Sequence, residues 1–207
     1  MKKSIVSLRV LCITLCVLLG ALVFSCASTG GSTGGSTGGV QNEGQTGFWS
    51  WGVFNDVSEG GSSRINLVED VENIEGEVQM TYKITGEITN QYQYGFAGWY
   101  AIPDDPTQEK LKTISSFSFK VLGDGNTYFV MFATSDIEDS SFYRTTFSTK
   151  KGQVTTHTIK LSSLKQPEDW GIKKRFNQEN ALQLQWQTTN NGKPGTFDIK
   201  VYDIRLY

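Results

Sequence analysis

A strand–turn–strand pattern occupies residues 116–134, which read SFSFKVLGDGNTYFVMFAT. Phe117, Phe119 and Val121 alternate with polar residues, which is typical of a strand with one buried face. Residues 123–126 are of the types that tolerate positive φ, as a tight turn requires. Residues 127–133 are apolar on both parities and indicate a strand covered on both sides. We therefore predict a β-hairpin here.

Similar alternation continues on both sides of this hairpin, for example at Val78, Met80, Tyr82 and Ile84 and at Leu182, Leu184 and Trp186. Gly, Pro, Asn and Asp clusters separate the runs, and only residues 161–180 leave room for a helical turn or two. The pattern predicts an all-β domain, an antiparallel sandwich or jelly roll of about eight or nine strands, over residues 47–207.

The last strand changes parity within itself. Phe197, Ile199 and Val201 point one way, whereas Ile204 and Leu206 continue on the opposite parity. A β-bulge between residues 201 and 203 would reconcile the two halves and would re-aim Asp203.

The N-terminal region has the features of a leader and a tether. Three basic residues precede an apolar run over residues 10–23, which is short for a membrane span. The run ends in Leu-Val-Phe-Ser-Cys26, which resembles a bacterial lipobox, so we expect a signal peptide at residues 1–25 and lipid on Cys26. The alternative is a plain signal peptide or signal anchor with an incidental cysteine.

Residues 26–46 contain three Ser-Thr-Gly-Gly repeats, whose small uncharged side chains predict a flexible tether. A lipid, a tether and a domain together predict a module anchored to the membrane of the bacterial cell envelope.

Composition argues against several function classes. A formal net charge of −2 without a basic cluster argues against nucleic-acid binding. The three cysteines all lie within the first 26 residues and His157 is the single histidine, so the domain has no disulfide framework and no Cys-based zinc site. Because no nucleophile with a partner base is apparent, we predict that the protein is not an enzyme.

Several segments resemble the complex I intermediate-associated protein family. They are Asn55-Asp56 with residues 60–63, residues 95–98, the 117–128 strand–turn–strand, residues 142–149 and residues 195–204. The resemblance implies a galactose-binding-like jelly roll similar to carbohydrate-binding module family 11, whose members bind β-glucans across one concave sheet. Some family members assist the assembly of respiratory complexes.

Candidate ligand-binding residues follow from strand parity. Trp99 lies between two alanines and is a candidate platform for a sugar ring, although core packing is the alternative. Gln183, Gln185 and Gln187 form a polar row opposite an apolar one, and their amides can donate to and accept from sugar hydroxyls. Arg144 lies on the polar parity of its strand, and Trp170 is a candidate rim aromatic in a polar segment.

The resemblance also raises the question of a structural ion, because related jelly rolls often carry Ca²⁺. Asp203, Asp56 and Asn55 are candidate oxygen ligands, and turn or edge carboxylates are the alternative. We otherwise expect no cofactor.

These observations predict a lipid-anchored, non-catalytic envelope module that binds a glucan-type glycan. The alternatives are a module that binds another envelope protein and a surface antigen that has lost its ligand.

Overall fold

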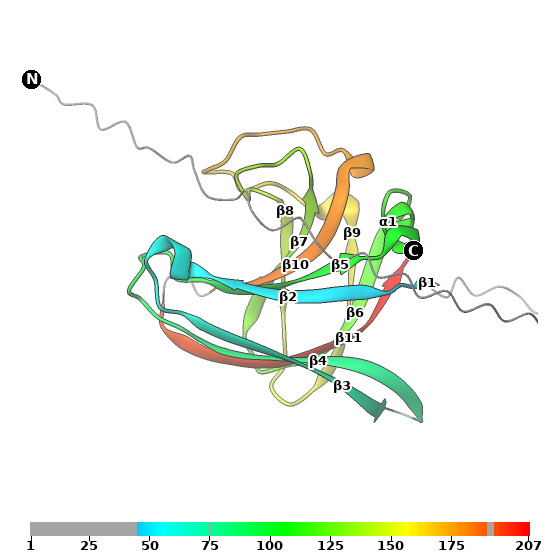
Figure 1. Ribbon diagram of the computed structural model, residues 1–207, viewed down its shortest axis with the longest axis horizontal. Helices are drawn as coiled ribbons and strands as arrows, with labels where there is room; N and C mark the ends of the chain where they lie inside the picture. The colour runs from blue at the N-terminus through cyan, green and yellow to red at the C-terminus, as the bar shows by residue number, and fades with distance from the viewer. Residues whose placement is uncertain (1–44, 75, 190–192) are drawn as a thin grey trace, which may run out of the picture. The chain divides into compact units, whose positions relative to one another are not determined.

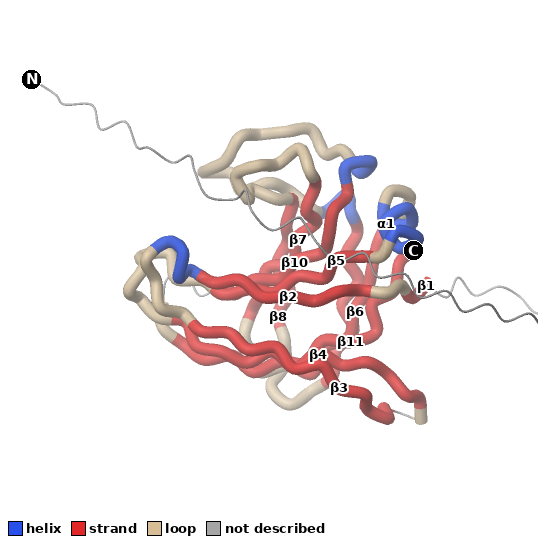
Figure 2. Tube along the Cα trace, in the orientation of Figure 1, coloured by secondary structure: helices blue, strands red, loops and turns tan. Residues whose placement is uncertain are grey.

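β-Strands dominate the residues that the computed structural model describes, which are 45–74, 76–189 and 193–207 and lie in one compact unit, Val40–Tyr207. Helices are short (Figure 2). In chain order the strands are β1 (Gln45–Thr46), β2 (Trp49–Asn55), β3 (Arg64–Ile74), β4 (Glu77–Ile88), β5 (Ala97–Pro103), β6 (Ser116–Leu122), β7 (Thr127–Thr134), β8 (Tyr143–Ser148), β9 (Val154–Lys160), β10 (Ala181–Thr188) and β11 (Gly195–Leu206).

Two antiparallel sheets face each other (Figure 1). The sheet that we call the β11 sheet has the order β3-β4-β11-β6-β9, and β1 pairs with the end of β11. The other, the β10 sheet, has the order β2-β5-β10-β7-β8. The predicted all-β sandwich is confirmed, and its central strands are the alternating segments found in the sequence.

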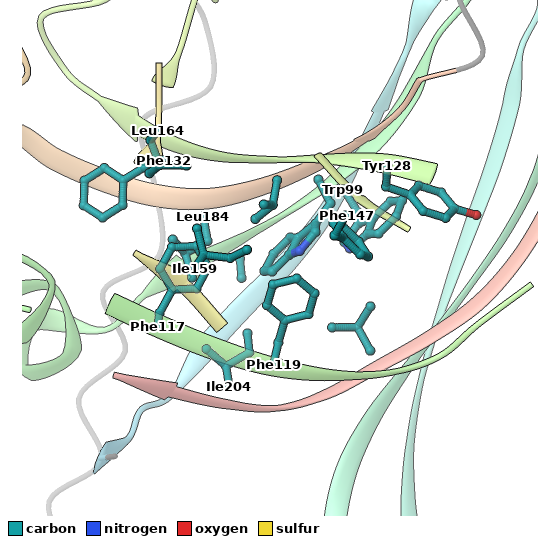
Figure 3. Close-up of a cluster of buried hydrophobic side chains, with 14 of the residues drawn as sticks. Trp99, Phe117, Phe119, Tyr128, Phe132, Phe147, Ile159, Leu164, Leu184 and Ile204 are labelled. Atoms are coloured by element: carbon teal, nitrogen blue, oxygen red, sulfur yellow. The ribbon is translucent and has the colours of Figure 1, made fainter. Parts of the chain in front are cut away.

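Aromatic side chains fill the space between the sheets (Figure 3). The Trp186 ring stacks near Trp51 and Trp99, at centroid distances of 5.5 and 6.3 Å. Phe119 from the opposite sheet meets Trp186 edge-on at 5.5 Å. Since Trp186 and Trp99 are directly opposite each other on neighbouring strands, strand register sets this stack.

The 116–134 segment is not the hairpin that the sequence predicted. Its strands β6 and β7 belong to different sheets, so the turn between them is an arch that crosses the sandwich. The Asp124 carboxylate holds the arch by accepting hydrogen bonds from the Tyr128 hydroxyl at 2.6 Å, the Thr149 hydroxyl at 3.1 Å and the Asp198 backbone N–H at 3.1 Å. Gly125 has a φ of 96°, as expected from its turn chemistry. Periodicity thus located both strands but not their partners.

The predicted bulge in β11 is confirmed. The pairing of β11 with β6 shifts register between Tyr202 and Arg205. Asp203 lies in this interval with a φ of 50°, which is rare for a residue other than glycine. The shift allows Val201 and Ile204 both to face the core.

Two further predictions need correction. Residues 105–111 form a helix, α1 (Asp105–Leu111), because the Asp104 side chain caps it by accepting from the Thr107 N–H at 3.0 Å. The alternating face of β4 is only partly buried: Ile84 is in the core, but Val78 is 74% exposed. The reason is that the β3–β4 hairpin extends beyond the edge of the facing sheet (Figure 1).

Candidate functional site

The outer face of the β10 sheet, which points away from the core, gathers most of the predicted ligand-binding residues. Strand register places the following side chains on it: Ser50, Gly52 and Phe54 from β2, Gly98, Tyr100 and Ile102 from β5, Gln183, Gln185 and Gln187 from β10, Thr127, Phe129, Met131 and Ala133 from β7, and Arg144, Thr146 and Ser148 from β8. We call this surface the outer face.

Two aromatic rings lean across the strands of the outer face. The Tyr100 ring covers Gly52, its partner on the neighbouring strand, and the Phe54 ring covers its partner Gly98. A β-carbon at either glycine would overlap the ring, so the glycines allow the rings to lie against the backbone. Both rings remain partly exposed, which leaves them available to a flat apolar surface such as the CH face of a sugar.

This aromatic surface continues into the loop that precedes β5. Phe96 lies 6.2 Å from Phe54, and Tyr92 lies 6.4 Å from Phe96, measured between ring centroids. Tyr94, which is well exposed, meets Tyr92 edge-on at 5.8 Å. The outer face therefore has an aromatic side, over β2 and β5.

The three glutamines share one face of β10, as strand parity predicted, and this amide row lies beside the two rings. Gln185 is paired with Tyr100, and Gln187 with Gly98. Gln183 follows a register irregularity after Ala181 and is opposite Ala133. These three side chains make no hydrogen bond with any other residue that the structure describes, so their amide groups are available to a ligand.

Arg144 lies on the far side of the amide row, on β8. Its guanidinium carbon is 4.2 Å from the centroid of the Phe129 ring and 5.9 Å from that of Trp170. Trp170 is 43% exposed, as expected for a rim residue. Burial lowers the pKa of Arg144, and the charge of Asp169 opposes that shift. The structure thus brings together five of the six predicted ligand-binding residues.

The sixth, Trp99, is wrongly predicted as a sugar platform. Its side chain is 0% exposed and points into the core, where it stacks on Trp186 and meets Tyr128 edge-on (Figure 3). The small residues Ala97 and Ala101 make space on the core face, not on the surface. The platform belongs instead to the opposite parity of the same strand, at Tyr100.

The structure does not bring the three proposed calcium ligands together. The Asp56 carboxylate is buried and accepts from the Ser63 N–H and hydroxyl, at 2.9 and 2.7 Å, and from the Phe96 N–H at 3.2 Å. The Asn55 side chain instead accepts from the Val57 N–H at 3.2 Å.

Asp203 is held elsewhere, between two cations. Its carboxylate lies 2.7 Å from Arg205 Nε and 3.1 Å from Lys120 Nζ. Since the three residues share no partner, the predicted grouping is wrong. In the part of the chain that the structure describes, no group of three or more His, Cys, Asp and Glu side chains could hold a metal ion.

The ion pairs of Asp203 predict a pH-dependent contribution to stability. Burial alone would raise the pKa of Asp203, but the hydrogen bonds and charges of Arg205 and Lys120 bring it below its ordinary value. A lowered pKa stabilises the folded state above the unfolded-state pKa of about 3.9, and this contribution disappears as the pH falls through the folded-state value. Asp203→Asn is therefore expected to lower the free energy of unfolding by about 2 kcal/mol at neutral pH, and by less under acid conditions.

Urea unfolding of both proteins between pH 7 and about pH 3 measures this difference. Asp198→Asn is the control, because Asp198 is well exposed and its pair with Lys83 at 3.7 Å should contribute little. If the difference in the free energy of unfolding between wild type and Asp203→Asn stayed constant down to about pH 3, the lowered pKa of Asp203 would be contradicted.

The leader at residues 1–25, Cys26 and all but the last two residues of the proposed tether lie outside the described residues. Within the described ranges, none of the helices has both the length and the apolar character needed to cross a membrane.

Sequence reasoning missed Tyr100 and Phe54. The signal was present, because Gly52 and Gly98 interrupt strand patterns, and a glycine within a strand often marks the close approach of another group. Which group approaches depends on the pairing of β2 with β5, which the sequence does not state.

Comparison with solved structures agrees with the fold. The chain is similar in fold to the family 11 carbohydrate-binding module of the cellulosomal cellulase Lic26A-Cel5E of Clostridium thermocellum, with 14% identity, a TM-score of 0.55, and coverage of 83% of this chain and 95% of that one. It also resembles an exo-beta-agarase structure, with 10% identity and a TM-score of 0.50 over 76% of this chain but only 23% of the agarase. At these identities the likeness shows the fold alone.

The sequence itself gives the family. No curated protein shows a significant match. The profile of the complex I intermediate-associated protein 30 family matches residues 40–201, which include nearly the whole described domain and the outer face. The chain therefore belongs to the complex I intermediate-associated protein 30 family.

Proposed function

We propose that this protein is a non-catalytic module that binds carbohydrate through the outer face. The observation that carries the proposal is the pair of rings, Tyr100 and Phe54, lying against the backbone of the sheet beside unpaired glutamine amides. Rings that stack on sugar CH groups and amides that bond hydroxyls are the two contacts that a glycan needs. The likeness to a family 11 module supports the same reading.

The proposed location is the bacterial cell envelope, where lipid on Cys26 and the Ser-Thr-Gly-Gly tether would hold the domain off a membrane. Mass spectrometry of the mature N terminus tests the anchor, since an unmodified Cys26 would contradict it.

Tyr100→Ala should weaken binding of a soluble oligosaccharide by about tenfold, because a lost ring contact is worth roughly 1 kcal/mol or slightly more. Isothermal titration against a panel of oligosaccharides measures the affinity. Val78→Ala is the control, because Val78 is 74% exposed on β4 of the opposite sheet. Equal affinities for wild type and Tyr100→Ala would exclude the ring as a platform.

The second candidate function is protein interaction, which the family match favours, since the family's name refers to an assembly intermediate. The same face, with Trp170 at its rim, would then contact a protein of the envelope. This candidate predicts a co-purifying protein that Tyr100→Ala releases, and no response to any oligosaccharide. Tyr100→Ala therefore distinguishes the two functions, because it weakens oligosaccharide binding in the first and releases a co-purifying protein in the second.

A further inference from the structure

The described side chains of the outer face include a positive charge but no negative one. Among the described side chains that register places there, the aromatic, amide, hydroxyl and aliphatic groups are uncharged, and Arg144 alone carries a formal charge. No aspartate or glutamate projects from these five strands onto that face. A neutral sugar can be bound by amides and rings alone, so a lone cation on this face requires another explanation.

Arg144 forms no ion pair with the described residues. No described acidic group lies within 4.0 Å of its guanidinium, and its side chain makes no hydrogen bond to the described residues. The guanidinium instead has aromatic rings as neighbours, Phe129 at 4.2 Å and Trp170 at 5.9 Å. A partly buried cation without an ion pair loses hydration, and cation–π attraction compensates only part of that loss. Such an arrangement suits a cation whose anion arrives with the ligand.

The other charges near Arg144 come from the segment that borders β8. Lys165 pairs with Arg144 through two backbone hydrogen bonds of 2.9 and 3.1 Å, and its side chain is exposed. Asp169 is close enough to affect Arg144 electrostatically but forms no ion pair with it. Neither side chain forms an ion pair or hydrogen bond with the guanidinium, which therefore remains open to an anion that a ligand carries.

From this geometry we infer that the ligand is an acidic oligosaccharide, in which the carboxylate of a uronic acid residue binds the Arg144 guanidinium while another sugar ring, farther along the same chain, stacks on Tyr100. The inference rests on the proposed function and names the class of glycan. Guanidinium and carboxylate match as planar bidentate partners, so the pair would fix the ligand's orientation as well as its charge. The glutamine row lies between the two anchor points and would bond the hydroxyls of the sugars that span them.

The test compares chemically matched ligands. The purified protein is titrated with oligogalacturonate and oligoglucuronate, with their carboxyl-reduced neutral counterparts, and with uncharged β-glucan oligosaccharides. We expect the uronates to bind at least about tenfold more tightly than the reduced forms, with the difference shrinking as salt is added. Arg144→Gln should abolish the preference, and Arg144→Lys should restore only part of it because an ammonium group lacks the planar fork.

Arg64→Gln is the matched control, because it makes the same change of charge at an exposed position on β3 of the opposite sheet. It should leave the preference unchanged, and the unfolding curve of each variant confirms that it is folded. Neutral oligosaccharides that bind as tightly as uronates, or an Arg144→Gln variant that keeps the preference, would overturn the acidic ligand while leaving carbohydrate binding intact. If no oligosaccharide of either kind binds, the proposed function fails as well.

Discussion

Trp186→Ala is expected to lower the free energy of unfolding by about 3–5 kcal/mol, the range for removing a large aromatic side chain from a core. The indole is 0% exposed and is the meeting point of both sheets, with Trp51, Trp99 and Phe119 around it. Its removal leaves a cavity that three rigid aromatic neighbours cannot close, because their own positions are fixed by strand pairing. The loss would be a large fraction of the total stability of a domain of this size.

Urea unfolding followed by intrinsic fluorescence or circular dichroism measures this loss. Trp170→Ala removes the same side chain at an exposed position and should change the free energy of unfolding by no more than about 0.5 kcal/mol. Trp186→Phe should lie between the two because it keeps part of the packing. A similar stability for Trp186→Ala and Trp170→Ala would mean that the indole stack does not hold the sandwich together.

Asp56→Ala is expected to lower the free energy of unfolding by about 3 kcal/mol or more. The Asp56 carboxylate is buried where the chain leaves β2, and it accepts three hydrogen bonds from Ser63 and Phe96. Alanine would leave the Ser63 and Phe96 N–H groups without an acceptor in a buried site. Gly61 and Gly95 pack so closely around the carboxylate that a β-carbon at Gly61 would overlap it.

Equilibrium unfolding again provides the measurement. Glu59→Ala is the control, because Glu59 is an exposed acid in the same turn, η1 (Asp56–Glu59). Asp56→Asn keeps one acceptor oxygen and should recover part of the loss. If Asp56→Ala were no less stable than Glu59→Ala, the bonds to Ser63 and Phe96 would not stabilise the fold. The hydrogen bonds of Asp56 thus join the segment after β2 to residues 63 and 96.

The candidate site was only partly predictable from sequence. Parity alone placed Gln185, Gln187 and Arg144 on the polar side of their strands, because side chains alternate strictly along an extended chain. Parity could not say that Trp99 faces inward, since Ala97 and Ala101 beside it fit a core as well as a surface. The Tyr100–Gly52 contact could not be predicted from local sequence, because the two residues are 48 positions apart in the chain.

The sequence by itself determined the secondary structure class, the position of the main strands, the bulge in β11 and the family, because these depend on local alternation, turn chemistry and short motifs. Only the tertiary structure decided that β6 and β7 belong to opposite sheets, that Asp203 pairs with Lys120 and Arg205, and that Tyr100 and Arg144 share one face. These features arise from pairing between segments far apart in the chain. Local sequence does not encode such pairing, because many registers satisfy the same alternation and only global packing selects one.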